Sequence, residues 1–357
     1  MAPFAAALLN RYGLRNVTLS ALLTVVSALA ISLAMTKVWQ LVLLWGVVVG
    51  IGTGMTALVL GATVAARWFA ARRGLVIGIM TASAATGQLV FLPLLASLTE
   101  RMGWRIGLGL MCGLLGLAAL AVLLMMRDRP SDVGLRPFGD PGAEPLPAPP
   151  PNTAPIMAAA LGTLRDSAKT RVFWILFATF FICGASTNGL VQVHLIPMCL
   201  DFGIPQVQAA SLLAAMGVFD FVGTIASGWL SDRYDNRYLL FWYYGLRGLS
   251  LVLLPFSNFS FYGLSLFAMF YGLDWIATVP PTVRLTAQRF GPERANLVFG
   301  WIFAGHQLGA ATAAFGAGLS RTLLLSYLPA FFTAGALCIV AALITLAISR
   351  APKPAVA

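Results

Sequence analysis

Long apolar stretches separated by short polar turns dominate this chain. An apolar stretch of about 20 residues is long enough to cross the ~30 Å hydrocarbon core of a bilayer as a helix. The pattern predicts an all-α polytopic membrane protein with ten complete transmembrane helices. The expected helices cover residues 17–36, 39–66, 74–98, 104–126, 172–198, 206–230, 238–256, 260–283, 295–319 and 325–349.

Residues 127–170 interrupt this pattern and divide the chain. Nine of the twenty prolines lie between Pro130 and Pro155, in a segment with too few apolar residues to form a core of its own. We therefore expect a first half over residues 1–126, an extended and partly disordered linker over 127–170, a second half over 171–350, and a tail over 351–357.

Composition supports a membrane protein. Hydrophobic residues make up 59% of the chain and charged residues 10%, and the mean hydropathy is +0.86. Three of the four cysteines fall within apolar stretches and no CxxC spacing occurs, so the cysteines are expected to be packing residues. No cofactor or metal site is expected.

The net charge of +11 could indicate a nucleic-acid partner, but the positions of the basic residues indicate membrane topology instead. If the first loop is cytoplasmic, cytoplasmic loops and tails hold eighteen of the basic residues and outer loops hold four. This asymmetry is the positive-inside bias. It predicts cytoplasmic termini for the given chain, a multi-pass protein of the inner membrane, and no nucleic-acid partner.

An internal repeat links two pairs of loops. LLNRYGLR aligns with LSDRYDNR, so that Asn10 matches Asp232 at an offset of 222 residues (232 − 10). RWFAARRGLVIG aligns with RFGPERANLVFG at the same offset, with Arg67 on Arg289. The matched loops are separated by an even number of predicted helices, so the two copies have the same orientation in the membrane. The chain is therefore expected to contain two parallel repeats.

These motifs carry a resemblance to a known family. GWLSDRYDNR, from Gly228 to Arg237, resembles the loop signature of the major facilitator superfamily. RWFAARRGLVIG, followed by a glycine-rich helix, is similar to the monocarboxylate-porter and oxalate/formate-antiporter branches. The resemblance covers nearly the whole chain and implies a fold of two six-helix halves.

The resemblance also implies that two helices precede the first basic loop, whereas Asn10 follows only nine residues. The given chain is therefore expected to be truncated at its N-terminus by about 50 to 60 residues, through a misassigned start or a shortened gene. The signature is also altered in this copy, where Asn10 replaces the aspartate and Ala6 replaces the glycine.

The basic loops are the first candidates for a mechanism. The resemblance implies that Asp232, Arg233 and Arg237 form contacts between helices that hold a cytoplasmic gate. Asn10, Arg11 and Arg15 would form the weaker first-half copy, and Gly228 belongs to the same signature. The alternative is that these arginines only fix the membrane topology.

Ionisable residues inside the predicted helices are the second set of candidates, because each costs roughly 2.5 to 3.5 kcal/mol at the bilayer centre. Asp220, Arg247, Asp274 and His306 all lie 10 to 12 residues from a basic loop, so they are expected at similar depths of about 15 to 18 Å. Sites for substrates and coupling ions in such carriers lie near this depth.

Asp220 and Arg247 lie on consecutive helices, so a buried ion pair between them is expected. Arg247 could instead bind a carboxylate substrate, since its planar fork suits that group. The resemblance implies an aspartate followed four residues later by an anion-binding arginine, but Thr224 stands at that place after Asp220.

Asp274 has no expected partner, and its repeat counterpart is Gly52. A carboxylate buried at that depth could load and release protons, or could form structural hydrogen bonds. His306 could relay protons or pack between helices. His194, towards the outer end of its helix, could line the outer mouth or mark a helix break at Pro197.

Taken together, the sequence predicts a secondary active transporter of a small organic anion, coupled to protons through Asp274 with His306 or Asp220 and acting as a monomer in the lipid bilayer. The alternatives are export of drug-like or amphipathic compounds and a truncated remnant that does not transport. A membrane-embedded enzyme is not favoured, because no loop shows the clustered acids or metal-ligand spacing that its chemistry would require.

Overall fold

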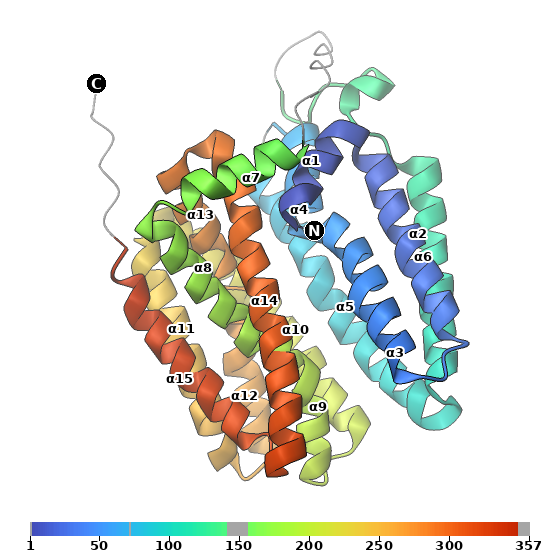
Figure 1. The fold of residues 1–357 in the computed structure, drawn as a ribbon, viewed down its shortest axis with the longest axis vertical. Helices are drawn as coiled ribbons and strands as arrows, with labels where there is room; N and C mark the ends of the chain where they lie inside the picture. The colour runs from blue at the N-terminus through green and yellow to red at the C-terminus, as the bar shows by residue number, and fades with distance from the viewer. Residues whose placement is uncertain (1, 71–72, 141–155, 349–357) are drawn as a thin grey trace. The chain divides into compact units, whose positions relative to one another are not determined.

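The computed structural model describes residues 2–70, 73–140 and 156–348. These residues are helical except for short turns and one isolated bridge between Phe69 and Phe138. The chain divides into two compact units, of which the first holds Met1–Thr81 and Leu95–Gly162 and the second holds Ala82–Leu94 and Thr163–Ala357. Figure 1 shows the helices coloured along the chain.

The first unit is built from long helices joined by tight turns. Its elements are α1 (Ala2–Tyr12), α2 (Leu14–Ser32), α3 (Val38–Leu41), the π-helix η1 (Val42–Val49), α4 (Gly50–Trp68), both ends of α5 (Arg73–Met102), α6 (Trp104–Met125) and the 3-10 helix η2 (Pro130–Val133). The elements α3, η1 and α4 follow one another without a break, so residues 38–68 form one continuous helical rod.

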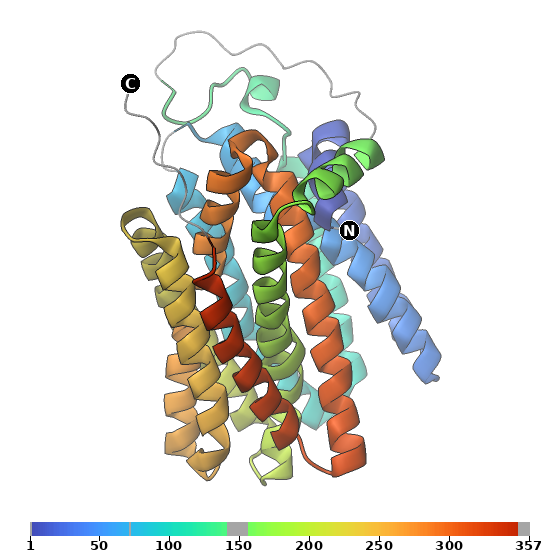
Figure 2. The ribbon, with the colours of Figure 1, turned by 60° about the vertical axis from the view of Figure 1, so that its left-hand side comes forward.

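The second unit contains the larger buried core. The boundary between the units falls within α7 (Ile156–Ser167), whose residues from Thr163 onward belong to the second unit. The elements of the second unit continue with α8 (Arg171–Gly184), the π-helix η3 (Ala185–Val191), α9 (Gln192–Asp201), α10 (Gln206–Arg233), α11 (Asn236–Leu253), the 3-10 helix η4 (Leu254–Ser257), α12 (Phe261–Leu273), α13 (Val279–Phe290), α14 (Pro292–Leu324) and α15 (Leu328–Thr345). Figure 2 shows these helices from another side.

Among the described residues, seven helical segments are long and apolar enough to cross a membrane. They are Leu14–Ser32, Val38–Thr56, Trp104–Met125, Arg171–Asp201, Gln206–Arg233, Asn236–Ser257 and Leu328–Thr345. Each matches one of the ten predicted stretches. The remaining three predictions, 74–98, 260–283 and 295–319, fall on α5, on α12 with α13, and on α14.

The prediction of one continuous helix over 260–283 is wrong. The helix ends at Leu273, residues 274–278 form turns, and α13 starts at Val279. Pro280 and Pro281 explain the break, because neither has the N–H group that a continuous helix would need at that position. The first half has Leu58 and Val59 at the matching positions, and its rod is unbroken there.

The repeat register of 222 residues holds for whole elements. Shifting α2 by 222 residues gives 236–254, which coincides with α11, and shifting the rod 38–68 gives 260–290, which coincides with α12 and α13 together. The same shift places α5 on α14 and α6 on α15 within a few residues. The two copies therefore have the same order of helices, as the parallel repeat requires.

The opening loop is shorter than the sequence suggested. The first basic loop, which contains Asn10, was expected to separate two helices, but α1 continues to Tyr12 and α2 begins at Leu14, so only Gly13 separates them. Gly13 has φ of +87°, a conformation that favours glycine. This geometry lets two helices meet at a single residue.

The predicted linker is more ordered than expected at both of its ends. After α6, η2 starts at Pro130, and Phe138 pairs with the loop after α4 through hydrogen bonds to Trp68 and Ala70 of 2.8 and 2.9 Å. At the other end, residues 156–167 form α7. Residues 141–155, which hold most of the prolines, lie outside the described part of the chain. The expectation of an extended linker is therefore wrong for its two ends.

Close helix contacts in the second unit depend on glycine. A Cβ atom at Gly184 of α8 would overlap the carbonyl of His306 in α14, and a Cβ atom at Gly309 would overlap the carbonyl of Phe181. These reciprocal approaches bring the backbones of α8 and α14 into direct contact, the type of packing that small residues allow between membrane helices.

Candidate functional site

Arg247 is the centre of a buried polar cluster in the second unit. It lies in α11 and its side chain is fully buried. Its Nε donates to Asp274 Oδ2 at 2.8 Å, its Nη1 donates to Cys183 Sγ at 3.0 Å, and its Nη2 donates to the backbone carbonyls of Asp274 and, at 3.1 Å, Trp275. Four of the five guanidinium N–H groups are thus used inside the protein.

Asp274 ends α12 and begins the helix break. Its carboxylate forms a salt bridge with Arg247, and its side chain is 8% exposed. The second carboxylate oxygen, Oδ1, is buried and has no hydrogen-bond partner. An acceptor without a partner in an apolar interior is costly, so this oxygen is a position where a proton or a donor group would be stabilised.

Asp220 and Ser227, both on α10, complete the support of the break. Asp220 Oδ1 accepts from the Ile276 backbone N–H and from Thr224 Oγ1, each at 2.9 Å. Ser227 Oγ donates to the Ala277 carbonyl at 2.6 Å. In an unbroken helix that carbonyl would accept from residue 281, but Pro281 has no N–H group. Side chains from neighbouring helices therefore satisfy peptide groups that the break releases.

The charges also match the ends of the two helix fragments. Arg247 donates to carbonyls at the C-terminal end of α12, where the helix dipole is negative, and Asp220 accepts an N–H group just before α13, where the dipole is positive. The break is therefore held by electrostatics as well as by hydrogen bonds.

The expected ion pair between Asp220 and Arg247 is wrong, and so is the expectation that Asp274 has no partner. Arg247 pairs with Asp274, and Asp220 binds the backbone on the other side of the break. The error arose because similar depth and consecutive helices do not fix which way a side chain points around its helix. Cys183 is also more than a packing residue, because it accepts from Arg247 and lies 3.3 Å from Thr278 Oγ1.

The first half provides an internal comparison for this cluster. Subtracting 222 from Arg247 and Asp274 gives Val25 and Gly52. These two residues also meet, since a Cβ atom at Gly52 would lie 2.6 Å from Val25 Cγ2. The fold thus repeats the contact and changes only its chemistry. The buried charges are not required by the architecture.

Ser227 shows the same difference between the halves. Its counterpart is Ala5, which is fully buried. The first-half rod has no break at the matching position and therefore releases no carbonyl that a hydroxyl would need to satisfy. Arg247, Asp274 and Ser227 of the cluster thus stand where the first half has Val25, Gly52 and Ala5.

His306 lies next to this cluster on α14. Its ring contacts Phe180 and stacks on Phe303, with ring centroids 5.1 and 5.4 Å away. Its backbone touches Gly184, the residue after Cys183. The ring is buried, and its Nδ1 has no hydrogen-bond partner. The aromatic contacts fit the packing alternative, whereas the unsatisfied nitrogen fits the proton-transfer alternative.

His194 lies apart from the other candidates. Its Nε2 is 2.8 Å from the carbonyl of Ala314, and its ring packs on Tyr327. Ala314 is eight residues beyond His306 on α14, which corresponds to about 12 Å along the helix. Pro197 lies within α9, which continues through it, so the alternative of a helix break at this position is wrong.

The second-half gate residues have different partners. Asp232, at the end of α10, forms a salt bridge with Arg284 of α13. Arg233 donates to the Trp229 carbonyl at 3.3 Å and lies over the Trp229 ring. Gly228 is one turn before Asp232, and a Cβ atom there would meet no other atom within 4 Å. Of these residues, Asp232 makes a contact between helices.

Arg237 and its first-half copy Arg15 cap the last helix of their own unit. Arg237 Nη1 donates to the Ile348 carbonyl at 2.9 Å, just beyond α15, and Arg15 Nη2 donates to the Leu123 carbonyl at 2.5 Å, near the end of α6. Cations are favourable at helix C-termini. Capping of a helix C-terminus therefore explains the presence of an arginine at both positions.

Fewer contacts are described for Asn10 and Arg11, the remaining gate residues of the first half. Arg11 is exposed and lies 5.5 Å from the centre of the Tyr12 ring. The side chain of Asn10 lies outside the part of the structure that is described. The first-half copy of the gate stays a prediction.

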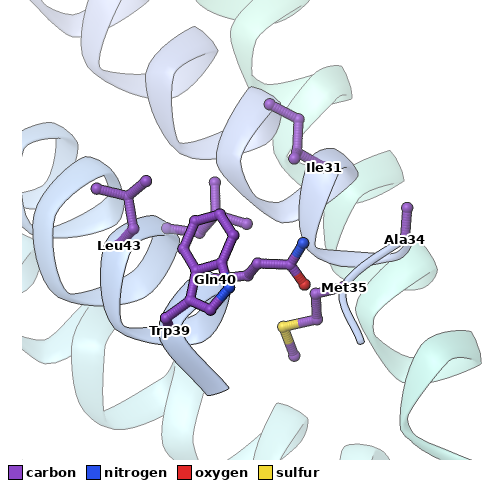
Figure 3. A pocket seen from close by; sticks show the side chains of 7 residues that line it. Ile31, Ala34, Met35, Trp39, Gln40 and Leu43 are labelled. Atoms are coloured by element: carbon purple, nitrogen blue, oxygen red, sulfur yellow. The ribbon is translucent and has the colours of Figure 1, made fainter. Parts of the chain in front are cut away.

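Figure 3 shows a small pocket in the first unit. It is lined by the end of α2 and by α3 with the start of η1, and six of its seven lining residues are apolar. Its polar member, Gln40, already accepts from the backbone N–H groups of Thr36 and Lys37 through Oε1. Among the described residues no group of three or more His, Cys, Asp or Glu side chains could hold a metal ion.

Comparison with known proteins agrees with this architecture. A family model described as Major Facilitator Superfamily matches residues 1–314 and 195–357. The chain resembles the uncharacterized MFS-type transporter YcxA of Bacillus subtilis, with 27% identity over 80% of this chain and 66% of that protein. It resembles Monocarboxylate transporter 13 of Bos taurus, with 28% identity over 94% of this chain and 73% of that protein.

A further relative is Monocarboxylate transporter 12-B of Danio rerio, with 28% identity over 60% of this chain. The chain spans 48% of that relative's length. Among solved structures, the Escherichia coli fucose:proton symporter FucP has a TM-score of 0.61 and 15% identity, and the match covers 98% of this chain and 88% of FucP. At that identity the likeness concerns the fold.

Proposed function

Because this chain belongs to the major facilitator superfamily, we propose that it transports a small monocarboxylate across the membrane and couples this transport to protons. Relatives named as monocarboxylate transporters support the substrate class. The observation that carries the proposal is the buried pair of Arg247 and Asp274, which replaces the apolar contact of Val25 and Gly52 at the same place in the repeat.

The proposed coupling acts through competition for Arg247. When Asp274 is ionised, its carboxylate and the carbonyls of the break engage most of the guanidinium N–H groups, so few remain for a substrate. A proton on Asp274 Oδ1 neutralises the carboxylate and weakens this hold. Arg247 can then present its fork to the carboxylate of a substrate. Proton and anion would thus bind together and cross together.

His306 is the proposed second proton carrier, with Asp220 as the group that fixes the break. The unsatisfied Nδ1 of His306 can accept a proton, and its helix contacts α8 beside Cys183. Asp220 is occupied by a backbone N–H group and by Thr224, which suits a positioning role better than proton transfer.

The contact of Asp232 with Arg284 is the proposed gate within the second half. Both side chains are partly exposed, at 68% and 39%, so the contact is worth less than about 1 kcal/mol by itself. A weak contact of this kind can break and re-form as the carrier alternates between two states. Following the distribution of basic residues, we place the basic loops in the cytoplasm and the protein in the inner membrane. The monomer stays a prediction.

Transport into proteoliposomes tests this proposal. Purified protein is reconstituted, and uptake of radiolabelled lactate is measured with and without an inward proton gradient. We expect the gradient to drive accumulation, unlabelled short monocarboxylates to compete, and lactamide, which lacks the carboxylate, not to compete. Uptake that is equally fast in protein-free vesicles, or competition by lactamide as strong as by lactate, would contradict the proposal.

A further inference from the structure

The helix α7, which precedes the first membrane-spanning helix of the second unit, has two distinct faces. Ala160 and Ser167 are buried, and Leu164 packs against the hydrophobic core of the second unit. Met157 and Leu161, one turn apart, are 60% and 46% exposed. An apolar pair on the outer face of a short helix is unfavourable in water, so this face is expected to have a partner.

Basic residues continue the exposed face towards α8. Arg165 follows Leu161 by one turn and is exposed, and Lys169 and Arg171 are exposed in the connection that follows. Arg294 of α14 adds a further exposed cation, 3.8 Å from Asp166. Asp166 is the acidic side chain within this group, and it also contacts Lys169 at 3.4 Å. We call Met157, Leu161, Arg165, Lys169, Arg171 and Arg294 the α7 surface.

The connection from α7 to α8 fixes the height of this surface relative to the membrane. Three residues, 168–170, separate the two helices, so the end of α7 lies within about 14 Å of the start of α8. The corner is ordered by hydrogen bonds, since Thr170 caps α8 and the exposed Trp174 donates to the Ala168 carbonyl at 2.8 Å. Tryptophan with a hydrogen-bonded N–H group is typical of the membrane interface.

The direction of α7 suits that location. Figures 1 and 2 both show α7 turned away from the direction of α8, which runs with the long helices. A helix in the plane of the interface buries apolar side chains at the boundary of headgroups and acyl chains, and places its cations among the headgroups. We propose that the α7 surface binds the anionic lipid headgroups of the leaflet on the side of the basic loops.

The charge of the surface selects the lipid class. Among the described side chains of this surface, four cations accompany the carboxylate of Asp166, so zwitterionic headgroups gain little from this surface whereas anionic headgroups gain from each exposed cation. Leu161 and Met157 provide the apolar contact that a soluble anion would not need. The bilayer therefore fits this surface better than free phosphate does.

Hydrogen exchange on the full chain in nanodiscs tests the proposal. Amides of residues 157–167 are followed by mass spectrometry in nanodiscs of phosphatidylcholine alone and in nanodiscs containing phosphatidylglycerol. We expect the amides of α7 to exchange more slowly in nanodiscs that contain the anionic lipid. This difference in exchange rate between the two kinds of nanodisc should shrink about fivefold in Arg165→Gln, and about fivefold again in the double variant Arg165→Gln with Lys169→Gln. Leu161→Asp should remove the protection in both lipids.

Two controls keep the outcome interpretable. Arg101→Gln removes an exposed cation from the end of α5 and should leave the exchange of α7 unchanged. The amides of α11 in the same samples report whether a variant still folds. Equal exchange of α7 in the two kinds of nanodisc, protection that survives the double variant, or the same protection on adding inorganic phosphate to phosphatidylcholine nanodiscs would each overturn the proposal.

Discussion

The two halves of this protein contain the same helix in two forms. Residues 38–68 of the first half make an unbroken rod, whereas the matching residues 260–290 of the second half are interrupted at 274–278. A break in a membrane helix is costly unless its peptide groups are satisfied. The second half satisfies them with buried polar side chains, and three of these, Arg247, Asp274 and Ser227, have the first-half counterparts Val25, Gly52 and Ala5.

This difference separates what the fold needs from what the proposed function needs. Because the first half keeps the same helix order with Val25 against Gly52, the architecture does not require a charge at that contact. Arg247 and Asp274 are therefore better explained by an activity than by stability. Buried ion pairs in general are weak evidence of stabilisation.

Removing one member of the pair should have the largest effect on stability. In Arg247→Val, the carboxylate of Asp274 and two backbone carbonyls lose their partner inside the protein, and we expect a loss of about 3 to 5 kcal/mol. Thermal unfolding in detergent measures this change. Adding Asp274→Gly copies the first-half pair and should recover part of the loss, because no unpaired charge remains. If the double variant were less stable than Arg247→Val, the comparison between the halves would fail.

Replacing Pro280 and Pro281 should make the broken helix of the second half more like the unbroken rod of the first half. With Pro280→Leu and Pro281→Val, residues 280 and 281 regain N–H groups that can bind the carbonyls of residues 276 and 277. We expect slower hydrogen exchange between 275 and 283 and a large reduction in transport, because the substrate site loses its break. Unchanged exchange in this segment would show that the prolines do not cause the break.

Ser227→Ala copies Ala5 of the first half and should have a smaller effect. The carbonyl of Ala277 loses its donor and stays buried, which costs about 1 to 3 kcal/mol. Ser211→Ala is the matched control, because Ser211 lies on the same helix and donates to Val207 within its own helix at an exposed position. Equal unfolding temperatures for the two variants would contradict the role assigned to Ser227.

A still smaller effect concerns the cap of α2. In the second half, Asp235 caps α11 by accepting from the Arg237 backbone N–H. In the first half, Gly13 stands at that position, and Asp128 from the end of α6 accepts the matching N–H of Arg15 at 2.8 Å. Asp128→Ala should therefore cost about 1 kcal/mol. We expect Asp132→Ala, a nearby acidic control that bonds within η2, to cost less. Thermal unfolding measures both variants. If Asp128→Ala lowered the unfolding temperature no more than Asp132→Ala does, the assignment of Asp128 as the cap of α2 would be contradicted.

The sequence predicted the helices and the repeat because apolar length and a constant offset are properties of the chain alone. Among the described residues, seven of the ten expected helices match segments that are long and apolar enough to cross a membrane, and two more fall on the long helices α5 and α14. The offset found in two loops extends to whole elements. Arg247 and Asp274 were both identified as buried candidates. Their pairing was missed because it depends on the rotation of helices about their axes.

The break could have been found from the sequence. Pro280 and Pro281 stand where the repeat partner has Leu58 and Val59, which indicates a helix end in one copy only. The support of the break could not have been found in the same way. Ser227 looks like any small residue of a membrane helix until the carbonyl of Ala277 is placed beside it.

Asp274→Asn tests the central claim most directly. The variant retains an acceptor for Arg247 Nε but cannot take up and release a proton. Reconstituted protein is assayed for lactate accumulation driven by a proton gradient and for exchange of labelled against unlabelled lactate without a gradient. We predict that accumulation is lost while exchange persists, because exchange needs no proton release. Gradient-driven accumulation at the level of the unmodified protein would contradict the account.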